Sequence, residues 1–154
     1  MGEMRIRFVL DGYEVEADVK LTDTLFRVLK DRLGVRSVHF GCGEGSCGAC
    51  IVLVDGKPRY SCLTLAASVD GKKVTTAAGL RVDGEIAEIQ RAFVEHNAAQ
   101  CGYCTPGMIL VAKALLDQNQ NPTDEEIYEA LAGNLCRCTG YVPIVEAIKS
   151  LARR

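Results

Sequence analysis

The stretch that decides the fold is Gly41-Cys42-Gly43-Glu44-Gly45-Ser46-Cys47-Gly48-Ala49-Cys50, a loop with three cysteines at the spacing C-x4-C-x2-C. A fourth cysteine, Cys62, follows after eleven intervening residues. The glycines permit positive φ angles and let backbone N–H groups come close to sulfur. We therefore expect three thiolates to wrap a small inorganic core from this loop, with the fourth arriving from a neighbouring strand.

The spacing itself is the one found in plant-type 2Fe–2S ferredoxins. A second set of four cysteines lies further on, as Cys101-x2-Cys104 and, after 31 residues, Cys136-x-Cys138. Two close pairs from two loops can supply four thiolates to a second 2Fe–2S core. A four-cysteine zinc site also uses paired cysteines, so the second set alone leaves structural zinc open. A disulfide framework and a thioredoxin-like redox pair at Cys101 and Cys104 stay open as well.

Composition places the chain among ordinary globular proteins. It has 154 residues, is 48% hydrophobic, and carries 18 Lys+Arg against 20 Asp+Glu, a formal charge of −2. Near-neutral charge without a basic block argues against nucleic-acid binding. Apolar runs fall far short of the ~20 residues that a membrane span needs. The N-terminus lacks the apolar region of a secretory signal, so a cytoplasmic protein is expected.

Hydrophobic periodicity divides the chain into two halves. The first half predicts two hairpins, turning at Asp11-Gly12 and Asp55-Gly56, one helix that begins near Thr24, and a further strand near Val74. The second half predicts four helices, and we expect them to form an antiparallel bundle. The expected helical segments are 85–97, 106–117 with Thr105 as its N-cap, 124–131 with a capping box at Thr123, and 143–151. We set the expected domains at 1–78 and 79–154, each with four cysteines.

Few residues in this sequence are candidates for catalysing the formation or cleavage of a bond. The two histidines, His39 and His96, have no plausible nucleophile or base partner in the pattern. We interpret His39 as a loop histidine and His96 as a helix C-terminal residue that suits the helix dipole. No glycine-rich phosphate motif follows a strand. We therefore expect no catalytic residue in this chain.

Three motifs in order resemble the small iron–sulfur subunit of molybdenum hydroxylases, the family of xanthine dehydrogenase, aldehyde oxidoreductase and carbon monoxide dehydrogenase. They are the loop 41–50 and the runs 100–108, QCGYCTPGM, and 133–141, GNLCRCTGY. The resemblance covers essentially the whole chain. It implies an α+β fold, with an N-terminal β-grasp, plant-type ferredoxin-like domain followed by a C-terminal four-helix-bundle 2Fe–2S domain. One departure is His39, where many relatives carry lysine.

The resemblance also implies roles. Cys101, Cys104, Cys136 and Cys138 would hold the cluster nearer a molybdopterin cofactor, and Cys42, Cys47, Cys50 and Cys62 the cluster nearer FAD. Gln100 would hydrogen-bond the pterin. Molybdopterin and FAD would belong to a large and a medium partner subunit, as a dimer of heterotrimers. The chain would relay electrons between them, as a non-catalytic subunit of an oxidoreductase.

Two rival functions remain open on the sequence alone. One is a free-standing two-cluster ferredoxin, for which the second half and Gln100 have no evident use. The other is a zinc-stabilised interaction module. The substrate of a complete enzyme is not encoded here, because the resemblance places its pocket in another chain.

Overall fold

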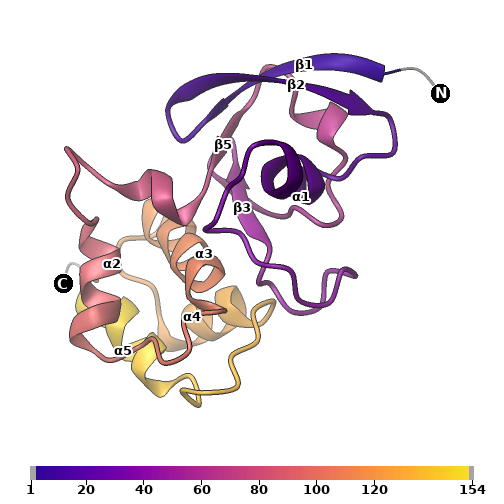
Figure 1. Cartoon of the computed structure of the whole chain (residues 1–154). Coiled ribbons are helices and arrows are strands. Elements are labelled where there is room, and N and C mark those ends of the chain that lie inside the picture. The colour runs from indigo at the N-terminus through magenta and orange to yellow at the C-terminus, as the bar shows by residue number, and fades with distance from the viewer. Residues whose placement is uncertain (1–2, 153–154) are drawn as a thin grey trace.

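The computed structural model describes residues 3–152, so residues 1–2 and 153–154, at the outer ends of the two expected domains, lie outside the described residues. Within 3–152 the chain forms five β-strands and five α-helices. The strands all lie in the first half, and the four longer helices in the second (Figure 1). The two halves lie side by side, with helix α3 (Thr105–Gln118) in contact with strand β3 (Ile51–Val54).

The first hairpin joins β1 (Glu3–Leu10) to β2 (Tyr13–Lys20) in an antiparallel register that pairs Leu10 with Tyr13. Asp11 and Gly12 both have positive φ, at 50° and 89°, as the two-residue turn requires. The predicted hairpin is thus confirmed at its predicted turn.

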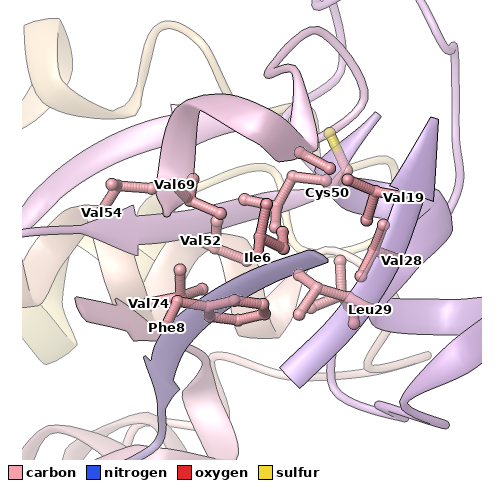
Figure 2. Close-up of a cluster of buried hydrophobic side chains, with 14 of the residues drawn as sticks. Ile6, Phe8, Val19, Val28, Leu29, Cys50, Val52, Val54, Val69 and Val74 are labelled. Carbon is pink, nitrogen blue, oxygen red and sulfur yellow. The ribbon is translucent and has the colours of Figure 1, made fainter. Parts of the chain in front are cut away.

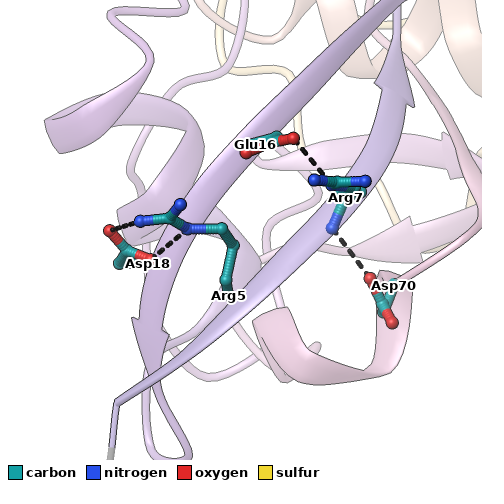
Figure 3. A network of polar contacts seen from close by, with 5 residues as sticks. All are labelled: Arg5, Arg7, Glu16, Asp18 and Asp70. Carbon is teal, nitrogen blue, oxygen red and sulfur yellow. Dashed lines mark hydrogen bonds and ion pairs between the residues drawn. The ribbon is translucent and has the colours of Figure 1, made fainter.

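Charged side chains mark the exposed face of this hairpin. Arg5 lies directly opposite Asp18 in the register, and Arg7 opposite Glu16, with ion-pair distances of 2.8 and 2.6 Å (Figure 3). The backbone N–H of Arg7 also donates to Asp70 at 2.7 Å. All of these groups are exposed, so each pair stabilises the fold by less than about 1 kcal/mol, and together they favour one register.

The complete sheet has the order β2-β1-β5-β3-β4. The second hairpin consists of β3 (Ile51–Val54) and β4 (Lys57–Tyr60), and β5 (Lys73–Thr75) lies between the hairpins. β5 pairs in parallel with β1 and antiparallel with β3. The last strand in the chain, β5, is therefore the central strand of the sheet and joins the two hairpins.

The helix predicted after Thr24 is irregular. It has one α-turn, α1 (Leu25–Arg27), capped by the Thr24 hydroxyl, followed by a π-helical turn over Val28–Arg32. The wide turn still points Val28 and Leu29 into the core, where neither is exposed. Figure 2 shows them with Ile6, Phe8, Val52 and Cys50, so that a cysteine of the first loop belongs to the core itself.

The second half consists of α2 (Glu88–Glu95), α3 (Thr105–Gln118), α4 (Asp124–Leu131) and α5 (Val142–Ser150). α2 contacts α3 and α5, and α4 contacts the same two helices. The core between them is apolar and fully buried, and includes Phe93, Met108, Ile127, Ile144 and Ile148. No helix within residues 3–152 has the length and apolar character needed to cross a membrane.

Three helix starts differ from the sequence expectation, α5 by one residue only, since it begins at Val142. α2 begins three residues later than Glu85, because Val82 and Glu85 pair across a tight turn with Asp83 and Gly84 at positive φ. α3 has Cys104 as its N-cap residue, so Thr105 lies inside the helix and does not cap it. α4 starts as predicted, with Thr123 and Glu126 in a reciprocal capping box.

Candidate metal centres

The eight cysteines are free thiols, and we call the four in each half a quartet. The first quartet consists of Cys42, Cys47, Cys50 and Cys62, and the second of Cys101, Cys104, Cys136 and Cys138. Burial differs between them. Cys50 and Cys62 are buried within the sheet domain's core, whereas Cys101 and Cys138 are exposed. The second quartet therefore reaches the protein surface.

The loop of the first quartet points backbone N–H groups at its own sulfurs. Ser46 and Glu44 donate N–H to the Cys42 sulfur at 3.2 and 3.4 Å, and Cys42 donates N–H to the Cys47 sulfur at 3.3 Å. Gly43 and Gly45 have φ of 73° and 80°, which allows the chain to curl around Cys42. Amide donors of this kind stabilise thiolate and sulfide charge.

These donors act on the acidity of the first quartet. Hydrogen bonds from Ser46, and then from the backbone of Glu44, lower the pKa of the Cys42 thiol to about 6. Burial, and then the neighbouring Cys50 thiol, raise the pKa of Cys62 to about 11. At neutral pH the Cys62 thiol therefore stays protonated without a cationic core, and a bound metal would supply the positive charge that ionises it.

Two glycines of the first cysteine loop stand where a larger side chain would not fit. A Cβ added at Gly41 would lie 2.5 Å from the Cys47 sulfur, far inside contact distance. A Cβ at Gly45 would lie 2.5 Å from the Leu63 side chain, just after Cys62. Glycine at these two positions therefore leaves room for the Cys47 sulfur and for the Leu63 side chain next to Cys62.

The second quartet is built from two loops at helix ends. Cys101 and Cys104 precede α3, and Cys136 and Cys138 lie between α4 and α5. The Cys136 sulfur has two contacts from Thr139, the hydroxyl at 3.1 Å and the N–H at 3.5 Å. The Cys136 N–H donates to the Tyr141 hydroxyl at 2.9 Å. The left-handed residue Tyr141 thereby anchors the loop in front of α5.

Acidity in this quartet follows burial and thiol neighbours. Burial, and then the Cys136 thiol, raise the pKa of Cys104 to about 12. Burial also acts on Cys136, but the two Thr139 hydrogen bonds outweigh it and lower the Cys136 pKa. The adjacent Cys101 thiol raises the pKa of Cys138. Each quartet thus contains one thiol with a lowered pKa and another with a raised pKa.

The thiols approach one another as pairs. Cys50 interacts with Cys62, Cys104 with Cys136, and Cys101 with Cys138, and the Cys42 and Cys47 sulfurs share one N–H network. Within residues 3–152 no three His, Cys, Asp or Glu side chains converge to hold one metal ion. A 2Fe–2S core has two irons with two protein ligands each, so one pair of thiols can serve each iron. The pairwise arrangement suits the binuclear core.

Several residues at the site were not singled out by sequence reasoning. Besides Thr139, they are Tyr103 and Asn134. His39, interpreted above as a loop histidine, contacts Tyr103: its Nδ1 lies 2.8 Å from the Tyr103 carbonyl oxygen, and the rings stack with centroids 4.6 Å apart. Thr139, Tyr103 and Asn134 lie close to cysteines within the sequence motifs, and this position is the signal from which they could have been found. His96 ends α2, as expected. Gln100 is exposed next to Cys101.

Family models match both halves. A model described as 2Fe-2S iron-sulfur cluster binding domain matches residues 8–80, and one described as 2Fe-2S binding domain matches residues 76–149. Together they include all eight cysteines.

Among curated proteins, the chain is 45% identical over 154 residues to the nicotinate dehydrogenase small FeS subunit of Eubacterium barkeri, covering 100% of this chain and 98% of that one. It is 48% identical over 139 residues to the nicotine 6-hydroxylase small subunit of Paenarthrobacter nicotinovorans, covering 90% and 84%. Among solved structures, quinoline 2-oxidoreductase from Pseudomonas putida 86 matches with a TM-score of 0.93 and 39% identity, over 97% of this chain and 93% of that chain.

Proposed function

This chain belongs to the small iron–sulfur subunits of the molybdenum hydroxylase family, and on that premise we propose that it relays electrons between a molybdopterin site and FAD in partner subunits. It is the electron-transfer subunit of a multi-subunit oxidoreductase, and its two 2Fe–2S domains carry two clusters. The observation that carries the proposal is that the four cysteines of each half lie as neighbouring thiol pairs inside a matched 2Fe–2S domain.

We assign the ligands by quartet. Cys42, Cys47, Cys50 and Cys62 would hold the first-half cluster, and Cys101, Cys104, Cys136 and Cys138 the second-half cluster. The thiol pairs suggest which cysteines share an iron: 42 with 47, 50 with 62, 104 with 136, and 101 with 138. The support is the chemistry of the sites, namely four cysteines in each half, backbone amides that donate to sulfur, and one glycine, Gly41, where a Cβ would strike the Cys47 sulfur.

Each cluster, when bound, supplies one-electron redox chemistry. The chain's own residues set the conditions for it. N–H groups of Ser46 and Glu44 and the Thr139 hydroxyl direct positive dipoles at sulfur, which stabilises added negative charge. Apolar packing around Cys50 and Cys62 keeps water from one side of the first site. The exposed cysteines of the second site face outward, where another cofactor can approach.

The type and the boundaries of the two domains are also part of the proposal. We propose that the sheet with α1 is a β-grasp, plant-type ferredoxin-like domain at 1–78, and that α2 to α5 are a four-helix bundle at 79–154. The sheet order and the mutual packing of the four helices support these assignments. The segment between Ala77 and Glu88 carries the connection.

Partner subunits belong to the proposal as well. We propose a large molybdopterin-binding chain and a medium FAD-binding chain, assembled as a dimer of heterotrimers in the cytoplasm. Gln100 is exposed beside Cys101, and Cys138 is exposed in the adjacent loop, so the second-half site offers a polar side chain and two thiols to such a partner. In this arrangement Gln100 hydrogen-bonds the pterin.

The test is anaerobic purification of the tagged chain from its native host, with iron and molybdenum counted per chain. We expect about four irons, about one molybdenum and two larger co-purifying chains. Four irons without molybdenum or partners would indicate a free two-cluster carrier and remove the role of Gln100. A colourless preparation containing zinc would contradict the cluster assignment.

A further inference from the structure

The two cysteine sites are joined directly by hydrogen bonds between their loops. The Leu135 N–H donates to the Cys47 carbonyl oxygen at 2.9 Å, and the Asn134 side-chain Nδ2 donates to the Gly48 carbonyl oxygen at 3.3 Å. Cys47 and Gly48 belong to the first cysteine loop, whereas Asn134 and Leu135 immediately precede Cys136. The contact therefore connects backbone within and next to the proposed ligands of both clusters.

Glycines make this close approach possible. Gly48 has φ of 74°, and a Cβ there would lie 2.5 Å from the Gly133 carbonyl oxygen and 2.6 Å from the Asn134 Nδ2. A Cβ at Gly107, in α3, would lie 2.4 Å from the Gly48 carbonyl oxygen. Three different segments thus carry glycine around one amide. The packing leaves no space for a side chain between Asn134 and the first loop.

Asn134 itself is an unusual residue for this position. Its side chain is only 1% exposed, and its Oδ1 has no hydrogen-bond partner among the described residues. Burying a half-satisfied amide is unfavourable compared with burying an apolar side chain of the same shape. The hydrogen bond that its Nδ2 donates to the Gly48 carbonyl oxygen is what an apolar residue could not supply.

A second bridge lies on the other side of the first loop. His39 and Tyr103 stack, and the Tyr103 hydroxyl donates to the Phe40 carbonyl oxygen, close before Cys42. Tyr103 lies between Cys101 and Cys104. Both loops of the second quartet therefore hold the single long loop of the first quartet.

We propose that Asn134 is a positioning residue that couples the two cluster sites, acting through the Gly48 carbonyl on the loop that carries Cys47 and Cys50. This inference rests on the proposed function, because it needs clusters in both quartets. If the sites are coupled in this way, a substitution in the second half alters the cluster of the first half. Coupling of this kind is reciprocal, so loss of the first cluster loosens the Asn134 loop.

The test compares Asn134→Leu with Tyr60→Phe, each in the assembled complex purified from its host. Both keep side-chain shape and both remove one donor between the halves, since the Tyr60 hydroxyl donates to the Gly133 carbonyl oxygen at 3.3 Å. Of these two side chains, only Asn134 donates to the first cysteine loop, residues 41–50. Iron per chain is counted, and electron paramagnetic resonance (EPR) of the reduced complex reports each cluster. Cys42→Ser identifies the first-half signal.

In Asn134→Leu we expect the first-half signal to shift or broaden, with up to half of the iron lost, while Tyr60→Phe keeps both wild-type signals. Unchanged signals, or a change confined to the second-half signal, would overturn the coupling. A measurement that leaves Asn134 intact is hydrogen exchange of segment 131–136 in Cys42→Ser. Faster exchange than in wild type supports coupling, and equal exchange overturns it. A wild-type complex lacking two distinct clusters would instead overturn the proposed function.

Discussion

The Gly41→Ala substitution tests the placement of a proposed iron ligand by steric displacement alone. Gly41 does not have positive φ, so alanine causes no left-handed strain there. The new Cβ would lie 2.5 Å from the Cys47 sulfur, and ordinary contact begins near 3.4 Å. One of the two atoms must therefore move by the difference, about 0.9 Å. Metal–ligand distances tolerate about 0.2 Å, so we expect the first-half cluster to be lost.

The assay is iron and acid-labile sulfide per chain, together with EPR of the reduced protein. Iron should fall from about four to about two, and one cluster signal should disappear while the second-half signal remains. The matched control is Gly56→Ala, in the turn between β3 and β4. Gly56 has φ of 77° but no atom within 4 Å of an added Cβ, so alanine costs roughly 1–2 kcal/mol of backbone strain without touching sulfur.

The control separates fold stability from ligand displacement. Gly56→Ala should melt at a lower temperature yet retain about four irons. If Gly41→Ala retained four irons and both signals, Cys47 would not be fixed at the site as the contacts indicate. Equal iron loss in both variants would mean that cluster content only follows stability.

Three further predictions follow from individual contacts. Cys101→Ser should remove the second-half cluster and uncouple substrate oxidation from flavin reduction, and full activity with full iron would contradict the ligand assignment. In the cluster-free chain at pH 7, iodoacetamide should modify Cys42 before Cys104, because a pKa of about 6 leaves about nine-tenths of Cys42 as thiolate, whereas the Cys104 pKa is about 12. The rate of Cys42 labelling should fall as pH drops below 6, because the thiol is then protonated, and peptide mass spectrometry that finds equal labelling of both thiols at pH 7 would refute the prediction. Thr123→Ala removes the Thr123 side of the α4 capping box and should destabilise the chain by about 1 kcal/mol, seen as a lower thermal midpoint with unchanged iron, whereas Ser at the same position should restore it.

Local sequence signals predicted the parts of the fold that depend on neighbouring residues. The Asp11-Gly12 turn and the capping box of Thr123 are defined within four residues, and both formed as expected. Thr105 was the exception. The pattern Thr-Pro is typical of a helix start, yet Cys104 takes the N-cap position and the Thr105 hydroxyl has no partner among the described residues. Competition between adjacent residues for one cap is decided by the path of the preceding cysteine loop.

Cysteine spacing by itself indicated two four-thiol sites, because ligand chemistry restricts how closely cysteines follow one another in a loop. Spacing does not say which thiols pair, how deeply each is buried, or that the sites touch. The parallel pairing of β5 with β1 and the contact of Asn134 with Gly48, 86 residues apart, arise only when the chain has packed. Such contacts depend on the mutual fit of distant surfaces, here on glycines in three segments, and no local pattern encodes that fit. The sequence alone therefore determined the chemistry of the two centres, and the tertiary structure decided their connection.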